Sequence, residues 1–240
     1  MSESVIQLKN VSKTFYIREK GNDSIRKKLL SIFDTNNGLR KLEALKNVNL
    51  DIKRGEFIGI VGHNGSGKST LLKIIIGAIQ ADEGGVVETK GKIVRLALGM
   101  GFDPELSARD NIYLNGSIMG LTFRQIGEKF HEIIEFSGLR NFIDTPLKFY
   151  SSGMVSRLAF AIAMHVEADI LLIDEFFGGV GDQDFREKSD KVFRESVING
   201  KTIVFVSHEL DIVKQYANRI FEFSGGQIIS HDENIKSQNH

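Results

Sequence analysis

Short apolar runs separated by longer helical patterns are the main feature of this sequence. Three such runs occupy residues 57–61, 169–173 and 202–206. Runs of this length that are apolar at nearly every position are typical of parallel strands buried on both faces of a sheet. A helical pattern follows each run, beginning with residues 70–77 after the first. This order predicts an α/β core with a mostly parallel sheet.

Two further segments carry weaker strand patterns, and a third segment has the pattern of a hairpin. Residues 5–15 and 43–52 show the mixed alternation of strands. Residues 221–230 have the pattern of a closing hairpin around Gly225 and Gly226.

The middle of the chain has a helical period. Helical segments are predicted near residues 107–120, 122–137 and 151–166. No internal repeat is visible. We therefore expect residues 1–240 to form one domain, in which a helical subdomain at about residues 103–166 interrupts the α/β core.

Residues 18–42 differ in kind from their surroundings. Within them, residues 24–33 form a basic amphipathic segment between two turn signals. In a helix, the apolar residues of this segment would share one face: Ile25, Leu29, Ile32 and Phe33. Two interpretations stay open, a surface helix that covers a strand edge and a helix that lies at a membrane surface or against a membrane partner.

Composition narrows the function classes. Lys+Arg and Asp+Glu are both 31, so no global basic field argues for a nucleic-acid partner. The chain has no cysteine, which excludes disulfides and thiolate metal sites. Its N-terminus lacks a signal-peptide pattern, and no apolar run approaches the roughly 18 residues that span a bilayer. We therefore expect a soluble, cytosolic chain.

The strongest chemical signal directly follows the first buried run. Eight residues fit the phosphate-binding loop G-x-x-x-x-G-K-[ST] without a mismatch: Gly62, His63, Asn64, Gly65, Ser66, Gly67, Lys68 and Ser69. The glycines let backbone N–H groups turn inward at the start of a helix, whose dipole also favours phosphate. Lys68 would reach the β- and γ-phosphates, and the Ser69 hydroxyl would bind Mg²⁺. The spacing predicts a site for a nucleoside triphosphate.

The two later apolar runs end in residues that suit the same site. Asp174 and Glu175 follow one run, and His208 follows the next. The carboxyl ends of such strands lie beside the phosphate loop in a doubly wound sheet. Asp174 would hold Mg²⁺, directly or through water, and Glu175 would act as general base on the attacking water. A lone histidine at a strand end is most often structural, but here His208 would face the γ-phosphate.

Together these residues resemble an ATP-binding cassette ATPase, the nucleotide-hydrolysing half of an ABC transporter, over nearly the whole chain. The resemblance implies a RecA-like phosphate-loop core with an antiparallel β subdomain and an inserted α-helical subdomain, and it implies ATP and Mg²⁺ as cofactors. It also implies that Phe15 stacks on adenine, with Tyr16 as the alternative, that Thr70 completes the loop, and that His208 is the family's switch histidine.

The resemblance also implies a dimer. Tyr150, Ser151, Ser152, Gly153 and Met154 stand where the family has its leucine-serine-glycine-glycine-glutamine segment. In the family, Ser151 and Gly153 would contact the γ-phosphate bound to a second copy, so that two ATP molecules lie between head-to-tail subunits. Ser151 also suits a simple helix N-cap, and the two roles are compatible.

A narrower resemblance concerns the transported substrate. Several segments are similar to ATPases that export lipid-linked polysaccharides: residues 98–107, residues 111–116, the 180–182 ending and the long insertion before residue 43. This implies O-antigen export, with teichoic acid or capsule as the alternative. It further implies a separate transmembrane permease as partner and a location at the cytoplasmic face of the bacterial inner membrane.

Three features depart from the family pattern. No glutamine occurs between Gln80 and Gln125, so the family's metal-sensing glutamine is missing, with Ala97 or Leu98 near its place. The stretch from Asp174 to Asp182 is one residue longer than usual, so that Gly178 and Gly179 stand where the family has one residue. The chain ends about ten residues after its last predicted strand, so we expect no C-terminal sugar-binding domain.

The main alternative of another class is a soluble ABC-type ATPase that acts on ribosomes or DNA without a permease. Such proteins usually carry two cassettes or a long coiled-coil insertion, and the neutral charge offers no nucleic-acid footprint. A GTPase is disfavoured because no Asn-Lys-x-Asp segment occurs. The presence of both Glu175 and His208 disfavours a non-hydrolysing cassette.

Overall fold

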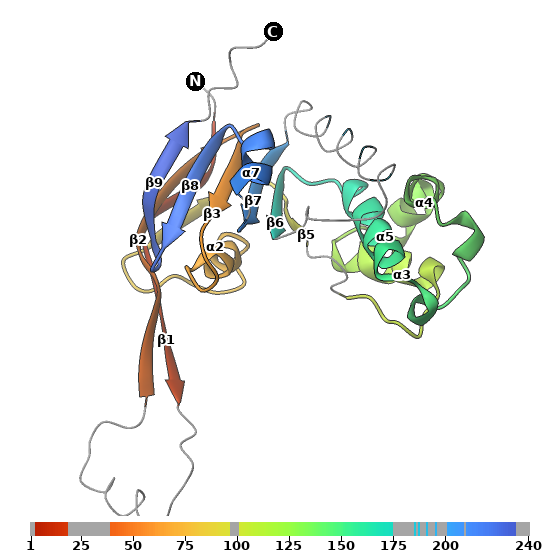
Figure 1. Ribbon diagram of the computed structural model, residues 1–240, viewed down its shortest axis with the longest axis horizontal. Coiled ribbons are helices and arrows are strands. Elements are labelled where there is room, and N and C mark those ends of the chain that lie inside the picture. The colour runs from red at the N-terminus through yellow and green to blue at the C-terminus, as the bar shows by residue number, and fades with distance from the viewer. Residues whose placement is uncertain are drawn as a thin grey trace, which may run out of the picture.

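The computed structural model describes residues 3–18, 39–96, 101–174, 201–208 and 210–233, together with residues 185, 187, 191 and 195. These residues form two sheets and a group of helices beside them (Figure 1). The strands are β1 Ser4–Arg18, β2 Leu39–Lys53, β3 Phe57–Val61, β4 Val86–Thr89, β5 Ile93–Leu96, β6 Ile170–Asp174, β7 Thr202–Ser207, β8 Arg219–Ser224 and β9 Gln227–Glu233. The helices are α2 Lys68–Ile75, α3 Ala108–Ile118, α4 Phe123–Ser137, α5 Ser152–Met164 and α7 Leu210–Tyr216, with short 3₁₀ turns at Arg140–Phe142 and Leu147–Phe149.

The larger sheet has six strands in the order β5-β6-β7-β3-β8-β9. Its first five strands are parallel, and β9 returns antiparallel to β8 as the predicted hairpin. The three apolar runs therefore form the neighbouring central strands β6, β7 and β3, and the mostly parallel α/β core is confirmed. Because these three strands run the same way, their carboxyl ends meet at one edge.

Alternation along the central strands divides the interior into two cores, since successive side chains of a strand point to opposite faces. Ile60, Leu172 and Val206 point to the face that α2 covers. Ile173 and Phe205 point to the other face and pack with residues of α3, α4, α5 and α7. Both faces are covered, which explains why these strands lack polar positions.

The smaller sheet is antiparallel and has the order β2-β1-β4. Its strands β1 and β2 continue beyond the sheet as a two-stranded ribbon (Figure 1), in which residues 15–18 pair with residues 39–42. Strands β1 and β2 are therefore longer than the predicted strands 5–15 and 43–52, and residues 18 and 39–42 of the expected insertion pair within the ribbon. Tyr16 and Leu42 on this ribbon are 67% and 44% exposed, so it has no buried face to give an alternating pattern. The predicted amphipathic segment 24–33 lies outside the described residues.

The helical segments start and end close to their predicted positions because each carries its own boundary signal. Ser107 caps α3 by accepting a hydrogen bond from the Asp110 backbone N–H. Thr122 and Gln125 form a reciprocal capping box at the start of α4. Gly138 ends α4 in the left-handed conformation, with φ of 67°. Helix α2 begins at Lys68 and ends at Ile75, two residues earlier at each end than predicted.

The packing of α7 on β3 gives a stability prediction. Gly59 lies in the middle of β3, and a methyl group added there would overlap the buried Val213 side chain of α7. Overpacking of this kind costs about 1–3 kcal/mol. Gly59→Ala should therefore lower the free energy of unfolding by about this amount in denaturant titration.

A matched control is Gly127→Ala in α4, where the new methyl group meets only the Tyr113 hydroxyl at 3.6 Å. Alanine is favoured over glycine in a helix by about 1 kcal/mol, so this variant should be as stable as the parent or more so. Equal stability of the two variants would contradict the close packing of α7 on β3.

Candidate active site

The loop at residues 62–69 connects the end of β3 to the start of α2. Gly65 and Gly67 adopt φ values of 79° and 111°, in the region that favours glycine. At Gly67 the backbone also passes close to the Ala44 carbonyl, because an added Cβ would lie 2.5 Å from that oxygen. The glycine positions are therefore required by the fold of the loop itself. Gly67 is the N-cap of α2 and has no side chain, so no side-chain group covers the first-turn N–H donors.

Lys68 is the first residue of α2 and is only 5% exposed. Its ammonium donates hydrogen bonds to the carbonyl oxygens of Gly62, at 2.6 Å, and His63, at 3.0 Å. The loop thus wraps around its own lysine. Within the part of the chain that the structure describes, the buried Ser66 hydroxyl has no hydrogen-bond partner. A buried cation and free backbone donors at a helix start are the features of an anion site.

A pocket of about 250 Å³ lies against this loop and brings distant parts of the chain together. The ribbon contributes Phe15 and its cross-strand partner Leu42. The loop and α2 contribute the other predicted residues: Asn64, Gly65, Gly67, Lys68, Ser69 and Thr70. A flat aromatic ring and an anion-binding loop therefore share one pocket. That arrangement suits a ligand with a planar base at one end and phosphates at the other.

Asp174 ends β6 and lies on the face of the sheet that α2 covers, because Ile170 and Leu172 of the same strand point there. Its carboxylate accepts a hydrogen bond of 2.6 Å from the guanidinium of Arg95 on β5. No local sequence pattern indicates this ion pair, because its two residues are 79 positions apart. Ser207 ends β7, which lies between β6 and β3, and the exposed His208 follows it. Glu175 and Asp182 lie outside the described residues.

Ser151 is the N-cap of α5, and its hydroxyl accepts a hydrogen bond of 3.2 Å from the Met154 N–H. The N-cap interpretation is confirmed. The neighbouring Tyr150 hydroxyl donates to the Phe142 carbonyl at 2.7 Å. Burial, together with the nearby Asp144 carboxylate, raises the pKa of Tyr150 to about 12, so this anchor stays neutral. Ser151, Ser152 and Gly153 do not line the pocket at the phosphate loop.

The donor atoms suit a magnesium ion. Ser69 has a hydroxyl and Asp174 a carboxylate, and these two residues would hold the ion because Mg²⁺ prefers such oxygen ligands. Among the described residues no group of three or more His, Cys, Asp or Glu side chains is placed to hold a metal by itself. Mg²⁺ commonly takes its other ligands from phosphates and water, so a site with few protein ligands fits this ion.

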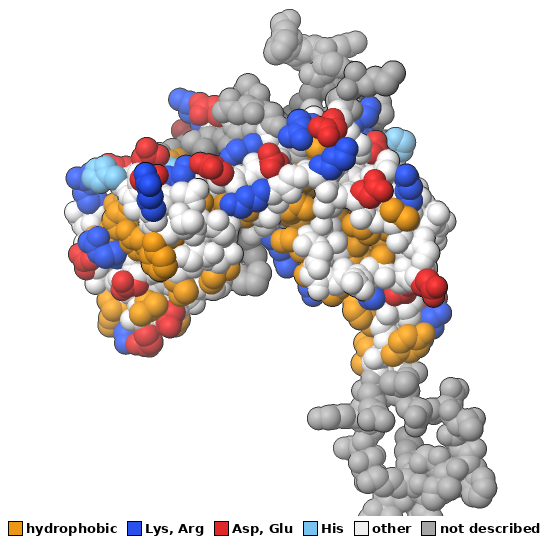
Figure 2. Space-filling view, turned by 180° about the vertical axis from the view of Figure 1, so that it is seen from behind, with side chains coloured by type: hydrophobic (Ala, Val, Ile, Leu, Met, Phe, Trp, Pro, Cys, Tyr) orange, Lys and Arg blue, Asp and Glu red, His pale blue; other side chains and the backbone are white. Residues whose placement is uncertain are grey.

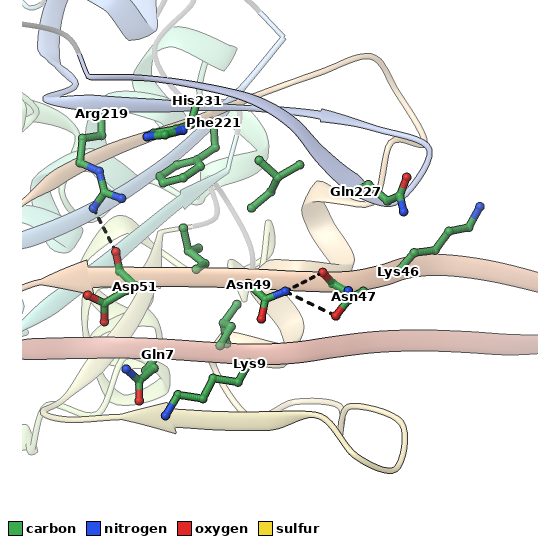
Figure 3. Close-up of a pocket in the computed structure, with 13 residues that line it drawn as sticks. Gln7, Lys9, Lys46, Asn47, Asn49, Asp51, Arg219, Phe221, Gln227 and His231 are labelled. Atoms are coloured by element: carbon green, nitrogen blue, oxygen red, sulfur yellow. Dashed lines mark hydrogen bonds between the residues drawn. The ribbon is translucent and has the colours of Figure 1, made fainter.

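A second, open pocket of about 690 Å³ lies between β2 and the β8–β9 hairpin (Figure 3). None of the predicted site residues lines it. Its half-buried cation, Arg219, already donates to the Asp51 carbonyl at 3.0 Å and to the Glu56 carboxylate at 3.1 Å. The chemistry therefore points to the smaller pocket at the phosphate loop.

The surface is mixed in charge. Figure 2 shows acidic and basic side chains interspersed on the face that it presents, in agreement with the equal totals of the two kinds. In the described part of the chain, no helix is both long and apolar enough to cross a bilayer.

Comparison with known proteins shows the family of this chain. The model of the ABC transporter family matches residues 45–178. The chain is 46% identical to the O-antigen export system ATP-binding protein RfbB of Myxococcus xanthus over 78% of this chain and 43% of that protein. It is 43% identical to the teichoic acids export ATP-binding protein TagH of Lactococcus lactis, over 77% and 39%. It is 35% identical to the O-antigen export system ATP-binding protein RfbE of Yersinia enterocolitica, over 95% and 97%.

Solved structures agree as well. The dimeric post-hydrolysis state of the ATP-binding cassette MJ0796 bound to ADP and Pi is 25% identical, with a TM-score of 0.73 over 95% of this chain and 98% of that one. The fold, the pocket and the family match lead to one conclusion. This chain belongs to the ABC transporter family and is an ATP-binding, ATP-hydrolysing cassette of that family.

The two left-handed glycines of the loop give a prediction for ATP affinity. Gly65→Ala adds a methyl group that meets nothing within 4 Å, so only backbone strain opposes it. That strain is about 1–2 kcal/mol, or about ten-fold in the dissociation constant. Gly67→Ala adds the close approach to the Ala44 carbonyl, and we expect at least about a hundred-fold loss. Calorimetric titration with ATP measures both, and equal losses would contradict the described backbone path.

Proposed function

We propose that this chain is the ATPase subunit of a bacterial ABC exporter of a lipid-linked polysaccharide, with O-antigen as the first candidate substrate. The observation that carries the proposal is the end-to-end match to an O-antigen export ATP-binding protein, over 95% of this chain and 97% of that one. The match to a teichoic-acid export ATPase keeps that polymer as the alternative. The balanced charge supports a partner other than nucleic acid.

In the proposed reaction, Phe15 stacks on the adenine and the backbone N–H groups of residues 62–69 surround the phosphates. The shared pocket of Phe15, Lys68 and Thr70 supports this pose. When nucleotide binds, the ammonium of Lys68 exchanges its hydrogen bonds with the loop carbonyls for contacts with the β- and γ-phosphates. These carbonyls, of Gly62 and His63, already hold the ammonium inside the loop, close to where phosphate would bind. Mg²⁺ on Ser69 and Asp174 would supply charge neutralisation at the phosphates.

Hydrolysis in this proposal needs a base for the attacking water and a polar contact to the γ-phosphate. Glu175 takes the proton of the attacking water, because it directly follows Asp174, the proposed metal ligand at the end of β6. His208 donates a hydrogen bond to the γ-phosphate from the end of β7. The position of β7 between β6 and β3 supports a shared site for these residues and the loop.

The site is completed by a second copy in this proposal. Ser151, Ser152 and Gly153 stand at the start of α5 and do not line the pocket at the loop of their own chain, and the N–H groups of Ser152 and Gly153 suit an anion. Head-to-tail association would bring them to the γ-phosphate of the partner. The similarity to a dimeric cassette supports this arrangement.

Transport would follow from the difference in nucleotide affinity between open and closed dimers. ATP binding favours the closed dimer, and hydrolysis returns it to the open one. The dimer would act beneath a separate transmembrane permease at the cytoplasmic face of the inner membrane. The export-system relatives support a subunit that works with a membrane permease.

The proposed base gives the first test of this function. Glu175→Gln removes the proton acceptor but keeps the side-chain volume, so ATP turnover should fall at least about a hundred-fold while ATP affinity stays near that of the parent. Phosphate release and calorimetric titration measure the two quantities. Glu128→Gln is a matched control, because Glu128 is exposed on α4 and pairs only with Arg124 in the described contacts.

The same variant tests the substrate in cells. A strain whose only copy carries Glu175→Gln should accumulate lipid-linked polymer inside and lose it from the surface, and chemical analysis of that polymer names it. Turnover at the parental rate would contradict the role of Glu175, and an unchanged surface polymer would contradict the exporter.

Ser151 allows a test that separates its capping role from its proposed role at the partner's phosphate. Aspartate caps a helix as well as serine does, so Ser151→Asp should keep α5 stable. Its negative charge would repel the partner's γ-phosphate and abolish ATP-dependent dimerisation, measured by sedimentation of the Glu175→Gln protein.

The control is Thr122→Asp, the same kind of change at the N-cap of α4. It should leave the ATP-dependent dimer intact. If Ser151→Asp dimerised as well as Thr122→Asp, Ser151 would be an N-cap and nothing more.

A further inference from the structure

The proposed magnesium ligand Asp174 already holds a cation from its own chain. The guanidinium of Arg95 donates to its carboxylate at 2.6 Å, and the two side chains are 22% and 17% exposed. Among the residues that the structure describes, Arg95 is the only one that bonds to the side chain of Asp174. The pair therefore shields a largely buried carboxylate that would otherwise be uncompensated.

Strand pairing places Arg95 on the face of the sheet that α2 covers. In the parallel pairing of β5 with β6, Arg95 lies opposite Leu172, and Asp174 follows two residues later on the same face. Ile93, two residues before Arg95, packs in the core that α2 covers. Arg95 and Asp174 thus lie on the α2 side of the sheet, and Ser69 is the second residue of α2.

Arg95 is not satisfied by this contact alone. Its Nε is buried and has no hydrogen-bond partner within the described part of the chain. The contact with Asp174 uses a single nitrogen, rather than the two-point contact that an arginine makes in its strongest carboxylate pairs. The other local cation, Lys68, is bound to the loop carbonyls. These features describe a pair that holds the carboxylate in place yet can be exchanged.

We propose that Arg95 is a positioning residue that acts as the resident counter-ion of Asp174, so that binding of Mg²⁺ with nucleotide replaces one cation by another. The proposal rests on the proposed function of Asp174 as a metal ligand. A carboxylate oxygen that accepts from Arg95 does not offer the same lone pair to Mg²⁺ or to its bound water. Arg95 therefore keeps Asp174 in place without metal and raises the Mg²⁺ concentration that the site requires.

The test measures ADP binding to the full chain by calorimetry over a series of Mg²⁺ concentrations, which involves no turnover. Arg95→Gln removes the competing charge, so the Mg²⁺ concentration at half-maximal ADP affinity should fall by about five- to ten-fold. Arg95→Lys keeps the charge and should stay near the parent. Arg109→Gln is the matched control, because its partner Asp144 lies in the helical region and the pair is more exposed.

Thermal unfolding provides a second readout that does not depend on ligand affinity. In EDTA, Arg95→Gln should melt below the parent, since Asp174 is then an unpaired carboxylate, and Arg95→Gln with Asp174→Asn should recover part of the loss. An unchanged or higher Mg²⁺ midpoint in Arg95→Gln would overturn the exchange of cations, and so would an Arg95→Lys variant that behaves like Arg95→Gln.

The titration distinguishes a failure of the metal role of Asp174 from a failure of the exchange of cations alone. Parent protein that binds ADP with no dependence on Mg²⁺ contradicts the metal role of Asp174 and the exchange together. Parent protein with a clear dependence, but with the same midpoint in Arg95→Gln, contradicts the exchange alone.

Discussion

The parallel pairing of β6, β7 and β3, with both faces buried, is the constraint on which the rest of this structure depends. Because side chains alternate between the two faces, the strands must be apolar at every interior position, and polar residues enter only where the strands end. All three strands end at the same edge. The phosphate loop, Asp174 and His208 therefore lie at that edge, although Asp174 and His208 follow the loop by more than a hundred residues.

Much of this arrangement could be predicted from the sequence because its signals are local. The three apolar runs are strands, and the glycine spacing of the loop matches a backbone that needs positive φ at Gly65 and Gly67. Caps such as Thr122 and Gly138 mark the ends of α4 within the sequence itself. The family, the fold and the nucleotide were therefore predicted correctly, and Ser151 does cap α5.

The remaining features depend on partners far away in the chain. Strands β4 and β5 have four residues each, too few to show a period, and they exist because β1 and β6 pair with them. The extension of β2 to Leu39 follows from pairing with β1 along a ribbon exposed on both faces. The contact between Arg95 and Asp174 spans 79 positions and has no local signature. It places a cation at the carboxylate proposed to bind the metal.

We infer that the loop, the ribbon and the end of β6 together hold one Mg²⁺–nucleotide. The decisive measurement is a crystal structure with Mg²⁺ and a non-hydrolysable ATP analogue. We expect phosphates inside residues 62–69, the base on Phe15, and the metal bound to Ser69 and, directly or through one water, to Asp174 after Arg95 has moved away. A nucleotide seated in the pocket between β2 and β9, or a metal distant from Asp174, would show that these three elements do not hold the ligand together.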